Sequence, residues 1–348
     1  MATLAVAATI DLAYGKEASL VVTLVFAPFV ASALLPARET AVSALAAVVL
    51  AALLGLPDGT FGTSPQLVRV LAIAAGGTLA VRLARERVRR EKKLTAIAQV
   101  AETAQETILR PLPDRLGDLR LADRYVSASA EAQVGGDFYE ALQTEWGVRI
   151  VVGDVRGKGL DAVRLAALLL GEFRSRARRE PDLAKVVAAV DEGGSSAGPA
   201  WGEDFATALF LQFSGGTITA VRCGHPEPLL ARAGETLQPQ LAGTLPLCLG
   251  ADGAMQTTMQ LEPGDRLLVY SDGAIEARDA SGREFALDES FRRAAGAARL
   301  DDVLELLHAD LQSHCAASID DDVVLFLIEH DPLRRTRRHM VSHRSRST

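Results

Sequence analysis

The chain has 348 residues and a mass of 36.9 kDa; 49% of the residues are hydrophobic, 5% aromatic and 23% charged, and the mean hydropathy is +0.16. This apolar content excludes an intrinsically disordered chain, and the length predicts about two domains. Three scattered cysteines (Cys223, Cys248 and Cys315) are too few for a disulfide scaffold or a CxxC metal site, which favours a reducing compartment. The net charge of −7 is uneven: −1 over residues 1–81, +5 over 82–93, −16 over 94–330 and +5 over 331–348. These four segments are an apolar N-terminus, a basic collar, an acidic body and a basic tail.

Three apolar runs follow one another at the N-terminus, over residues 18–37, 40–57 and 64–84. Each reaches the roughly 18–20 residues that cross a bilayer core, and three runs without a basic leader do not fit a signal peptide. We therefore predict a membrane anchor over residues 1–84 with about three transmembrane helices, and the first ten residues as part of a truncated fourth. A buried helical hairpin in a soluble protein is the alternative.

Basic residues set the orientation of this anchor. The collar holds seven Lys and Arg residues, the loop 57–65 none, and the loop 36–40 one. Because basic loops stay in the cytoplasm, the collar and the loop 36–40 are predicted to be internal and the loop 57–65 external. The prediction is a multi-pass protein of the cell membrane with its acidic body in the cytoplasm.

Residues 85–110 predict one helix that leaves the membrane, and Pro111 and Pro113 end it. Its apolar positions are spaced as in the seam of a short coiled coil: Leu94, Ile97, Ala101, Ala104 and Ile108. A homodimer through this helix is one interpretation, and a stripe that lies on its own domain is the other. The predicted domains are thus the anchor (1–84), a linker helix (85–111), a body (112–330) and a disordered tail (331–348).

The acidic body combines short β-rich runs with two helical stretches. The predicted strands are 148–153, 206–213, 217–222, 266–270 and 322–328, and the predicted helices are 160–179 and 287–315. Strands in clusters, with helices between the clusters, predict an α+β fold.

Four acidic clusters lie at the ends of these strands: Gly135–Tyr139, Gly153–Gly159, Tyr270–Gly273 and Asp320–Asp322. A single Asp-Gly pair is usually a turn, but several carboxylates brought together need a cation between them. Oxygen ligands without His or Cys indicate Mg²⁺ or Mn²⁺ rather than Zn²⁺. The glycine-rich segment 153–159 does not have the spacing of a phosphate-binding Walker A loop, and His225 is interpreted as a structural turn residue.

Six segments occur in a characteristic order: GGDFYE, GDVRGKGLDA, FATALF, CGHPEPLL, LEPGDRLLVYSDGAIEARDASGREF and DDVVLFLI. Over about residues 112–329 they resemble the SpoIIE/RsbU branch of the PPM metal-dependent protein serine/threonine phosphatases. The resemblance implies an α-β-β-α sandwich of two antiparallel sheets flanked by helices. The anchor and the collar resemble those of actinobacterial membrane-bound members.

The resemblance also implies a site for two Mn²⁺ or Mg²⁺ ions. Asp154 matches the carboxylate that bridges both ions, with the Val155 carbonyl beside it. Asp272 and Asp321 match ligands of the second ion, and Asp137 matches the acidic residue near the first. The run Asp320–Asp322 leaves the register open by one residue, and Asp321 is preferred because DDVV matches the family pattern.

Two positions depart from the family. Arg156 stands where many eukaryotic relatives have a His proposed as general acid, so the proton donor to the leaving group is unassigned. Cys248 replaces a common Gly, and this change is expected to be harmless.

The implied activity is metal-assisted hydrolysis of phosphoserine or phosphothreonine without a covalent enzyme intermediate. The implied substrate is a phosphorylated anti-sigma-factor antagonist in a partner-switching pathway. A catalytically inactive pseudophosphatase that serves as a membrane-tethered binding module is the alternative, although all four Asp positions are filled. Nucleic-acid binding through the Arg-rich tail is disfavoured by the charge of −16 on the body, and the tail is more suited to the anionic inner leaflet.

Overall fold

The computed structural model describes residues 24–54, 56, 61–126, 135–196, 204–251, 253–315 and 321–332. The predictions for the first ten residues, for most of the loop 57–65, for Asp320 and for nearly all of the tail lie outside these ranges. The chain falls into two compact units, which divide between Ala96 and Ile97. The boundaries placed at residues 84, 111 and 330 stay predictions.

The N-terminal unit consists of α2 (Phe26–Leu34), α3 (Ala37–Leu54) and the first part of α4 (Ser64–Ile108). Two helical segments are long and apolar enough to cross a membrane, Ala37–Leu54 and Ser64–Ile97. They correspond to the second and third predicted spans. The first span is described only from residue 24 onward, so the three-span anchor stays a prediction.

Small residues fill the interior of the N-terminal unit. Ala47, Ala51 and Ala80 are fully buried, and a Cβ built on Gly77 would lie 2.9 Å from the Cβ of Ala44. Five leucines of this unit are more than half exposed, namely Leu45, Leu53, Leu67, Leu71 and Leu79, whereas Leu24, Leu54 and Ile73 are buried among the alanines. Helices in lipid pack through small residues in this way, whereas a soluble hairpin buries its large side chains. The small-residue contacts and the exposed leucines agree with the membrane interpretation, and the choice between it and a soluble hairpin stays a prediction.

The C-terminal unit contains two antiparallel sheets. The first has the strand order β1 (Arg115–Leu116), β2 (Leu119–Val126), β12 (Val323–His330), β11 (Arg266–Tyr270), β7 (Leu229–Arg232), β8 (Glu235–Leu237). The second has the order β10 (Thr257–Gln260), β6 (Thr217–Cys223), β5 (Ala206–Ser214), β4 (Gly147–Val155), β3 (Phe138–Thr144). The short β9 (Gly243–Thr244) pairs with β6 in parallel.

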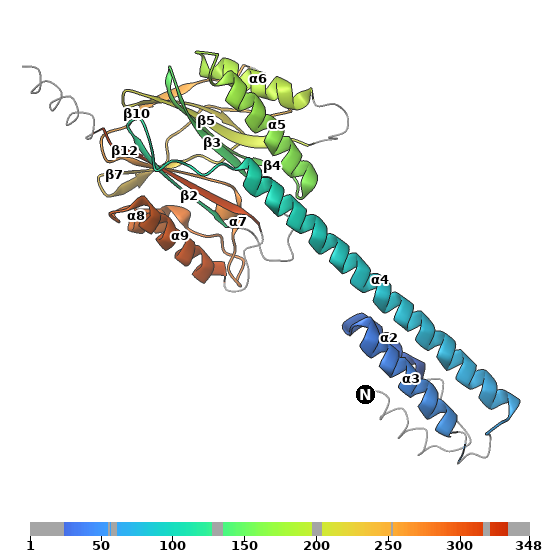
Figure 1. Ribbon diagram of the computed structural model, residues 1–348. Coiled ribbons are helices and arrows are strands. Elements are labelled where there is room, and N and C mark those ends of the chain that lie inside the picture. Colours follow the sequence, from blue (N-terminus) through green and yellow to red (C-terminus); the bar gives the residue numbers. More distant parts are fainter. Residues whose placement is uncertain are drawn as a thin grey trace, which may run out of the picture. The chain divides into compact units, whose positions relative to one another are not determined.

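Helices cover the outer face of each sheet. Buried side chains of α5 (Leu160–Arg176) and α6 (Leu183–Ser195) pack on the second sheet, and those of α8 (Leu287–Ala294) and α9 (Leu300–Cys315) pack on the first. The four layers are visible in Figure 1. The predicted α-β-β-α sandwich is confirmed.

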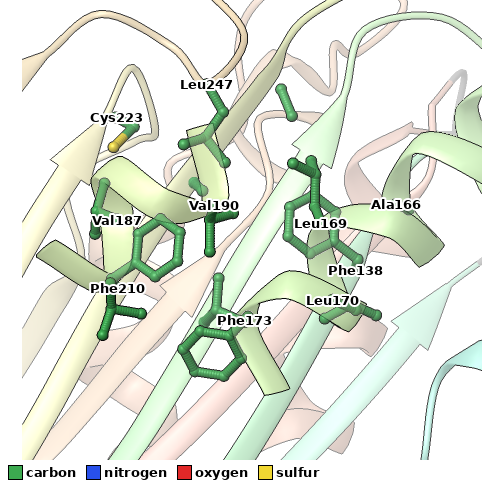
Figure 2. Packing of buried hydrophobic residues seen from close by; sticks show 14 of the residues in the cluster. Phe138, Ala166, Leu169, Leu170, Phe173, Val187, Val190, Phe210, Cys223 and Leu247 are labelled. Atoms are coloured by element: carbon green, nitrogen blue, oxygen red, sulfur yellow. The ribbon is translucent and has the colours of Figure 1, made fainter. Parts of the chain in front are cut away.

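The central strands are apolar on both faces because both faces are buried. In β5, Ala206, Ala208 and Phe210 face the helices, and the alternate residues Leu209 and Leu211 face the other sheet. The Phe210 ring lies 5.9 Å from the ring of Phe173 in α5. Figure 2 shows Phe173 and Phe210 within the cluster of buried side chains between the second sheet and its helices. This double burial explains the uninterrupted apolar runs that predicted the strands.

All five predicted strands are confirmed, and so is the helix that begins at residue 160. The single helix predicted over 287–315 is wrong, because residues 295–299 separate α8 from α9. Gly296 lies in this break, where its flexible backbone interrupts a helix. The sequence analysis did not predict α6, although Asp182 caps it by accepting a hydrogen bond from the Ala184 N–H at 3.0 Å.

The end of α4 lies on the body of its own unit. Ala104 and Ile108 pack against Val163 of α5, and Arg174 donates a hydrogen bond to the Ile108 carbonyl at 3.0 Å. Leu94 and Ile97 are exposed, and the side chain of Ala101 lies outside the described set. The C-terminal end of the predicted seam therefore contacts α5 of its own domain, and the homodimer through this helix stays a prediction.

Candidate metal centre

Strand register brings the acidic side chains to one end of the two sheets. Phe138 of β3 pairs with Gly153 of β4, which places Asp137 beside Asp154, and the Val155 N–H donates to the Gly136 carbonyl at 3.2 Å. In the other sheet the Ser271 N–H donates to the Val324 carbonyl at 3.1 Å. Asp272 and Asp322 therefore flank neighbouring strand ends.

These strand ends line one cavity of about 60 Å³. All residues predicted as ligands are there: Asp137, Asp154, Val155, Asp272 and Asp321. Asp322, Lys158 and three glycines complete the lining. The structure thus brings together side chains that are up to 185 positions apart in the sequence, Asp137 and Asp322.

Glycines allow this close approach. A Cβ on Gly135 would collide with the Asp322 carboxylate, and a Cβ on Gly136 would collide with the Val155 carbonyl. A Cβ on Gly273 would collide with the backbone carbonyl of Asp322. The Gly-Gly-Asp and Asp-Gly pairs are therefore needed for contact between the strand ends, in addition to any turn that they form.

Burial and like charge raise the pKa of three carboxyl groups. Asp137 is 2% exposed, and its pKa is well above the usual range because of burial and then repulsion from Asp154 and Asp322. Burial, followed by repulsion from neighbouring carboxylates, raises the pKa of Asp154 to about 8, and Lys158 opposes this rise. Burial and the charge of Asp321 raise the pKa of Asp272. The cluster thus carries more negative charge than its surroundings stabilise, which a bound cation would relieve.

Ser271 holds Asp137. Its hydroxyl accepts a hydrogen bond from the Val324 N–H at 2.9 Å and donates to Asp137 Oδ2 at 3.3 Å. Asp137 Oδ1 is buried and has no hydrogen-bond partner among the described residues. Sequence reasoning assigned no role to Ser271, although its place directly before Asp272 was the available signal.

Lys158 is a second residue that the sequence analysis did not assign. Its ammonium nitrogen lies 2.6 Å from Asp321 Oδ1. Burial lowers the pKa of Lys158, but the hydrogen bond and charge of Asp321 outweigh burial, so that the pKa is raised. Asp321 is half exposed and Asp322 is buried. Both line the cavity, so the preference for Asp321 as ligand stays a prediction.

Two further contacts lie next to the acidic cluster. Gln105 of α4 donates a hydrogen bond from Nε2 to the Asp137 carbonyl at 3.3 Å. His225 is buried, and its Nδ1 lies 3.2 Å from the hydroxyl of Thr207, which pairs with Asp154. Burial and then the charge of Arg222 lower the pKa of His225 to about 3, which keeps the ring neutral. A structural role for His225 agrees with these contacts.

Cys248 differs from its expected behaviour. Its φ of 69° lies in the left-handed region, which favours glycine. A side chain there costs about 1–2 kcal/mol. The replacement of a common Gly therefore has a backbone cost and is not neutral.

The donor chemistry fits hard divalent cations. Only oxygen atoms are offered, and Asp137 Oδ1 is a buried acceptor without a partner in the described part of the chain. Within the same ranges, no three carboxylate, imidazole or thiol groups are yet gathered closely enough to hold an ion.

The fold is that of the PP2C-type (PPM) protein serine/threonine phosphatases, a class of metal-dependent hydrolases to which the C-terminal unit is homologous. The family model for stage II sporulation protein E (SpoIIE) matches residues 144–331. The match covers more than half of the chain, and the chain belongs to the SpoIIE family.

Solved structures show the same fold. The SiaA-PP2C domain of Pseudomonas aeruginosa is 18% identical, with a TM-score of 0.59 over 71% of this chain and 99% of that chain. The RsbU and RsbW domains of Rv1364c from Mycobacterium tuberculosis are 26% identical, with a TM-score of 0.53 over 62% of this chain and 60% of that chain. A curated relative, Protein IcfG of Synechocystis sp. (strain ATCC 27184 / PCC 6803 / Kazusa), is 24% identical over 257 residues, which are 62% of this chain and 39% of that protein. The chain thus spans about two fifths of that relative's length.

Proposed function

We propose that this protein is a membrane-anchored phosphatase that hydrolyses phosphoserine or phosphothreonine on a protein. The observation that carries the proposal is the cavity in which five carboxylates from both sheets converge in a SpoIIE-family domain. The raised pKa values of Asp137, Asp154 and Asp272 add to it, because perturbed groups in a cleft mark functional sites.

Two Mn²⁺ or Mg²⁺ ions would be held by Asp154 and the Val155 carbonyl together with Asp137, Asp272 and Asp321. When bound, such ions activate water and neutralise charge on the phosphoryl oxygens. Ser271 fixes Asp137 in place. In the overall reaction water adds to phosphorus, the phosphorus–oxygen bond to the serine breaks, and a proton passes to the seryl oxygen. No nucleophilic side chain is required, because water is the attacking group.

The proposed substrate is a phosphorylated anti-sigma-factor antagonist. The resemblance to the SpoIIE/RsbU branch supports it, as does the likeness to a structure that contains RsbU and RsbW domains. Partner switching by dephosphorylation of a small protein would then be the role of the body.

The two apolar helices and their small-residue packing support an anchor in the cell membrane. The basic collar after them supports a cytoplasmic body. Leu94 and Ile97 are exposed on α4, and a homodimer through this part of the helix is included in the proposal.

An inactive binding module is the second candidate. The Lys158–Asp321 ion pair favours it, as does the absence of a gathered ligand group among the described residues. Such a module keeps the fold but does not bind cations tightly.

One experiment separates the two candidates. The full-length protein in lipid nanodiscs is incubated with Mn²⁺ and the host's phosphorylated antagonist proteins, and loss of phosphate is followed on phosphate-affinity gels. An EDTA sample and the Asp154→Asn variant are the controls. Mn²⁺-dependent dephosphorylation that both controls lack supports the phosphatase, and Mn²⁺-independent binding without turnover supports the module.

A further inference from the structure

We propose that Lys158 is the group that receives the phosphate of the substrate in the acidic cavity. This inference rests on the proposed function. Among the described residues that line the cavity, Lys158 is the only one with a positive charge. A phosphorylated side chain that enters an acidic cavity needs such a partner.

The backbone places Lys158 between the bridging carboxylate and a helix. Its loop joins β4, which carries Asp154, to α5, and both of its neighbours have positive φ: 102° at Gly157 and 87° at Gly159. These glycines let the chain reverse tightly beside the strand end. The lysine is thereby aimed back at the carboxylates, as its 2.6 Å contact with Asp321 shows.

Exposure places Lys158 on the open side of the cavity. The side chain of Lys158 is 35% exposed and that of Asp321 is 48% exposed, whereas Asp137 and Asp322 are only 2% and 5% exposed. A phosphoprotein must approach from the exposed side, where Lys158 is the cation of the described lining that matches a phosphate.

The charge of the site also calls for a cation of this kind. Five carboxylates and two divalent ions leave one negative charge, which would repel a phosphomonoester dianion. Lys158 cancels that remainder. Lys158 contacts Asp321, which is also a predicted ligand, so a cation that engages Asp321 would compete for this ion pair and favour contact of Lys158 with phosphoryl oxygens.

Arg156 is less suited to this role. Its guanidinium lies over the ring of Phe205, 5.4 Å from the ring centre, and Arg156 does not line the cavity. Of the two basic side chains in the loop 155–159, Lys158 therefore lines the cavity and Arg156 does not.

The test uses the full-length protein in nanodiscs with saturating Mn²⁺. Calorimetry gives the Kd for inorganic phosphate and, in separate titrations, the Kd for Mn²⁺; KM and kcat are measured with the phosphoprotein. Lys158→Met removes the charge, Lys158→Arg keeps it, and Lys185→Met is a matched loss of an exposed lysine on α6. A charge-assisted hydrogen bond predicts that Lys158→Met weakens phosphate binding and raises KM about tenfold, with Mn²⁺ binding unchanged or tighter. Lys158→Arg should restore most of the loss, and Lys185→Met should change nothing.

Two results would overturn the inference. One is unchanged phosphate affinity with tighter Mn²⁺ binding in Lys158→Met, which means that Lys158 only neutralises Asp321. The other is loss of Mn²⁺ binding in both Lys158→Met and Lys158→Gln with the fold intact by circular dichroism. If the wild type binds Mn²⁺ and phosphate but cleaves no phosphoprotein, the proposed function fails while the phosphate-binding role of Lys158 is still decided by the titrations.

Discussion

Asp154→Asn tests the electrostatic description of the cavity, because it removes one charge at almost constant volume. The pKa of Asp154 is about 8 in the fold against a usual value of 3.8. At about 1.4 kcal/mol per pKa unit, ionised Asp154 would destabilise the metal-free fold by at most about 6 kcal/mol. Its attraction to Lys158 and relaxation of the loop reduce this value, and we expect about 2–4 kcal/mol. Without metal, the variant should therefore be more stable than the wild type at pH 8.5.

The pH dependence has a definite sign. Between about pH 4 and about pH 8, Asp154 holds a proton in the folded protein that it has lost in the unfolded chain, because its pKa is raised by folding. The stability of the metal-free wild type therefore falls as the pH rises through this window. Asn does not titrate, so the slope should be shallower in the variant, and the two proteins should converge at or below about pH 4.

Thermal unfolding monitored by tryptophan fluorescence measures the effect. Trp146 lies in the C-terminal unit and residues 1–96 contain no tryptophan, so the signal reports the C-terminal unit in the full-length protein. In EDTA at pH 8.5 the variant should unfold about 5–12 °C higher than the wild type. Mn²⁺ should raise the Tm of the wild type by mass action and leave the variant nearly unchanged. A lower Tm of the metal-free variant, or equal stabilisation of both proteins by Mn²⁺, would refute the reasoning.

Three other predictions concern separate parts of the chain. Gly136→Ala forces a Cβ onto the Val155 carbonyl, so calorimetry should show Mn²⁺ binding weakened at least about tenfold; unchanged affinity would contradict the role of that carbonyl. Cys248→Gly should be more stable than Cys248→Ala by about 1 kcal/mol in urea unfolding, because φ is positive there; the reverse order would contradict it. A reporter fused after Lys93 should behave as cytoplasmic and one inserted in 57–65 as external, and protection of both from the same side would contradict the topology.

The sequence predicted the strands well because their apolar runs are bounded by Gly and Asp. β4, β5 and β11 are buried on both faces, so their sequences are mostly apolar and the ends of each strand can be recognised in the sequence. The break between α8 and α9 was missed because a single Gly within an apolar periodicity is also compatible with a continuous helix. Strands β2 and β3 carry polar residues at half-buried positions and gave no clear signal.

The sequence motifs predicted which residues belong to the candidate site, but not how these residues are arranged in space. That Asp137, Asp154, Asp272 and Asp321 share one cavity follows from a register between strands distant in the chain, which no local pattern specifies. The contacts of Ser271 and Lys158 arise from the same register. Asp321 and Asp322 are adjacent in the sequence, and only the structure distinguishes them, by their different exposure and by the ion pair of Asp321 with Lys158.

The glycines at the strand ends suggest a second way in which a homologous protein can lose its activity during evolution. Gly135, Gly136 and Gly273 each occupy a position where one methyl group would displace a carboxylate or a carbonyl of the cavity. A relative that keeps every aspartate but has Ala or Ser at one of these positions would have the ligands and lack the space between them. Inactive homologues are therefore to be sought by inspecting the glycines as well as the acidic residues, and a relative with all three glycines but without Asp154 would mark a loss of a different origin.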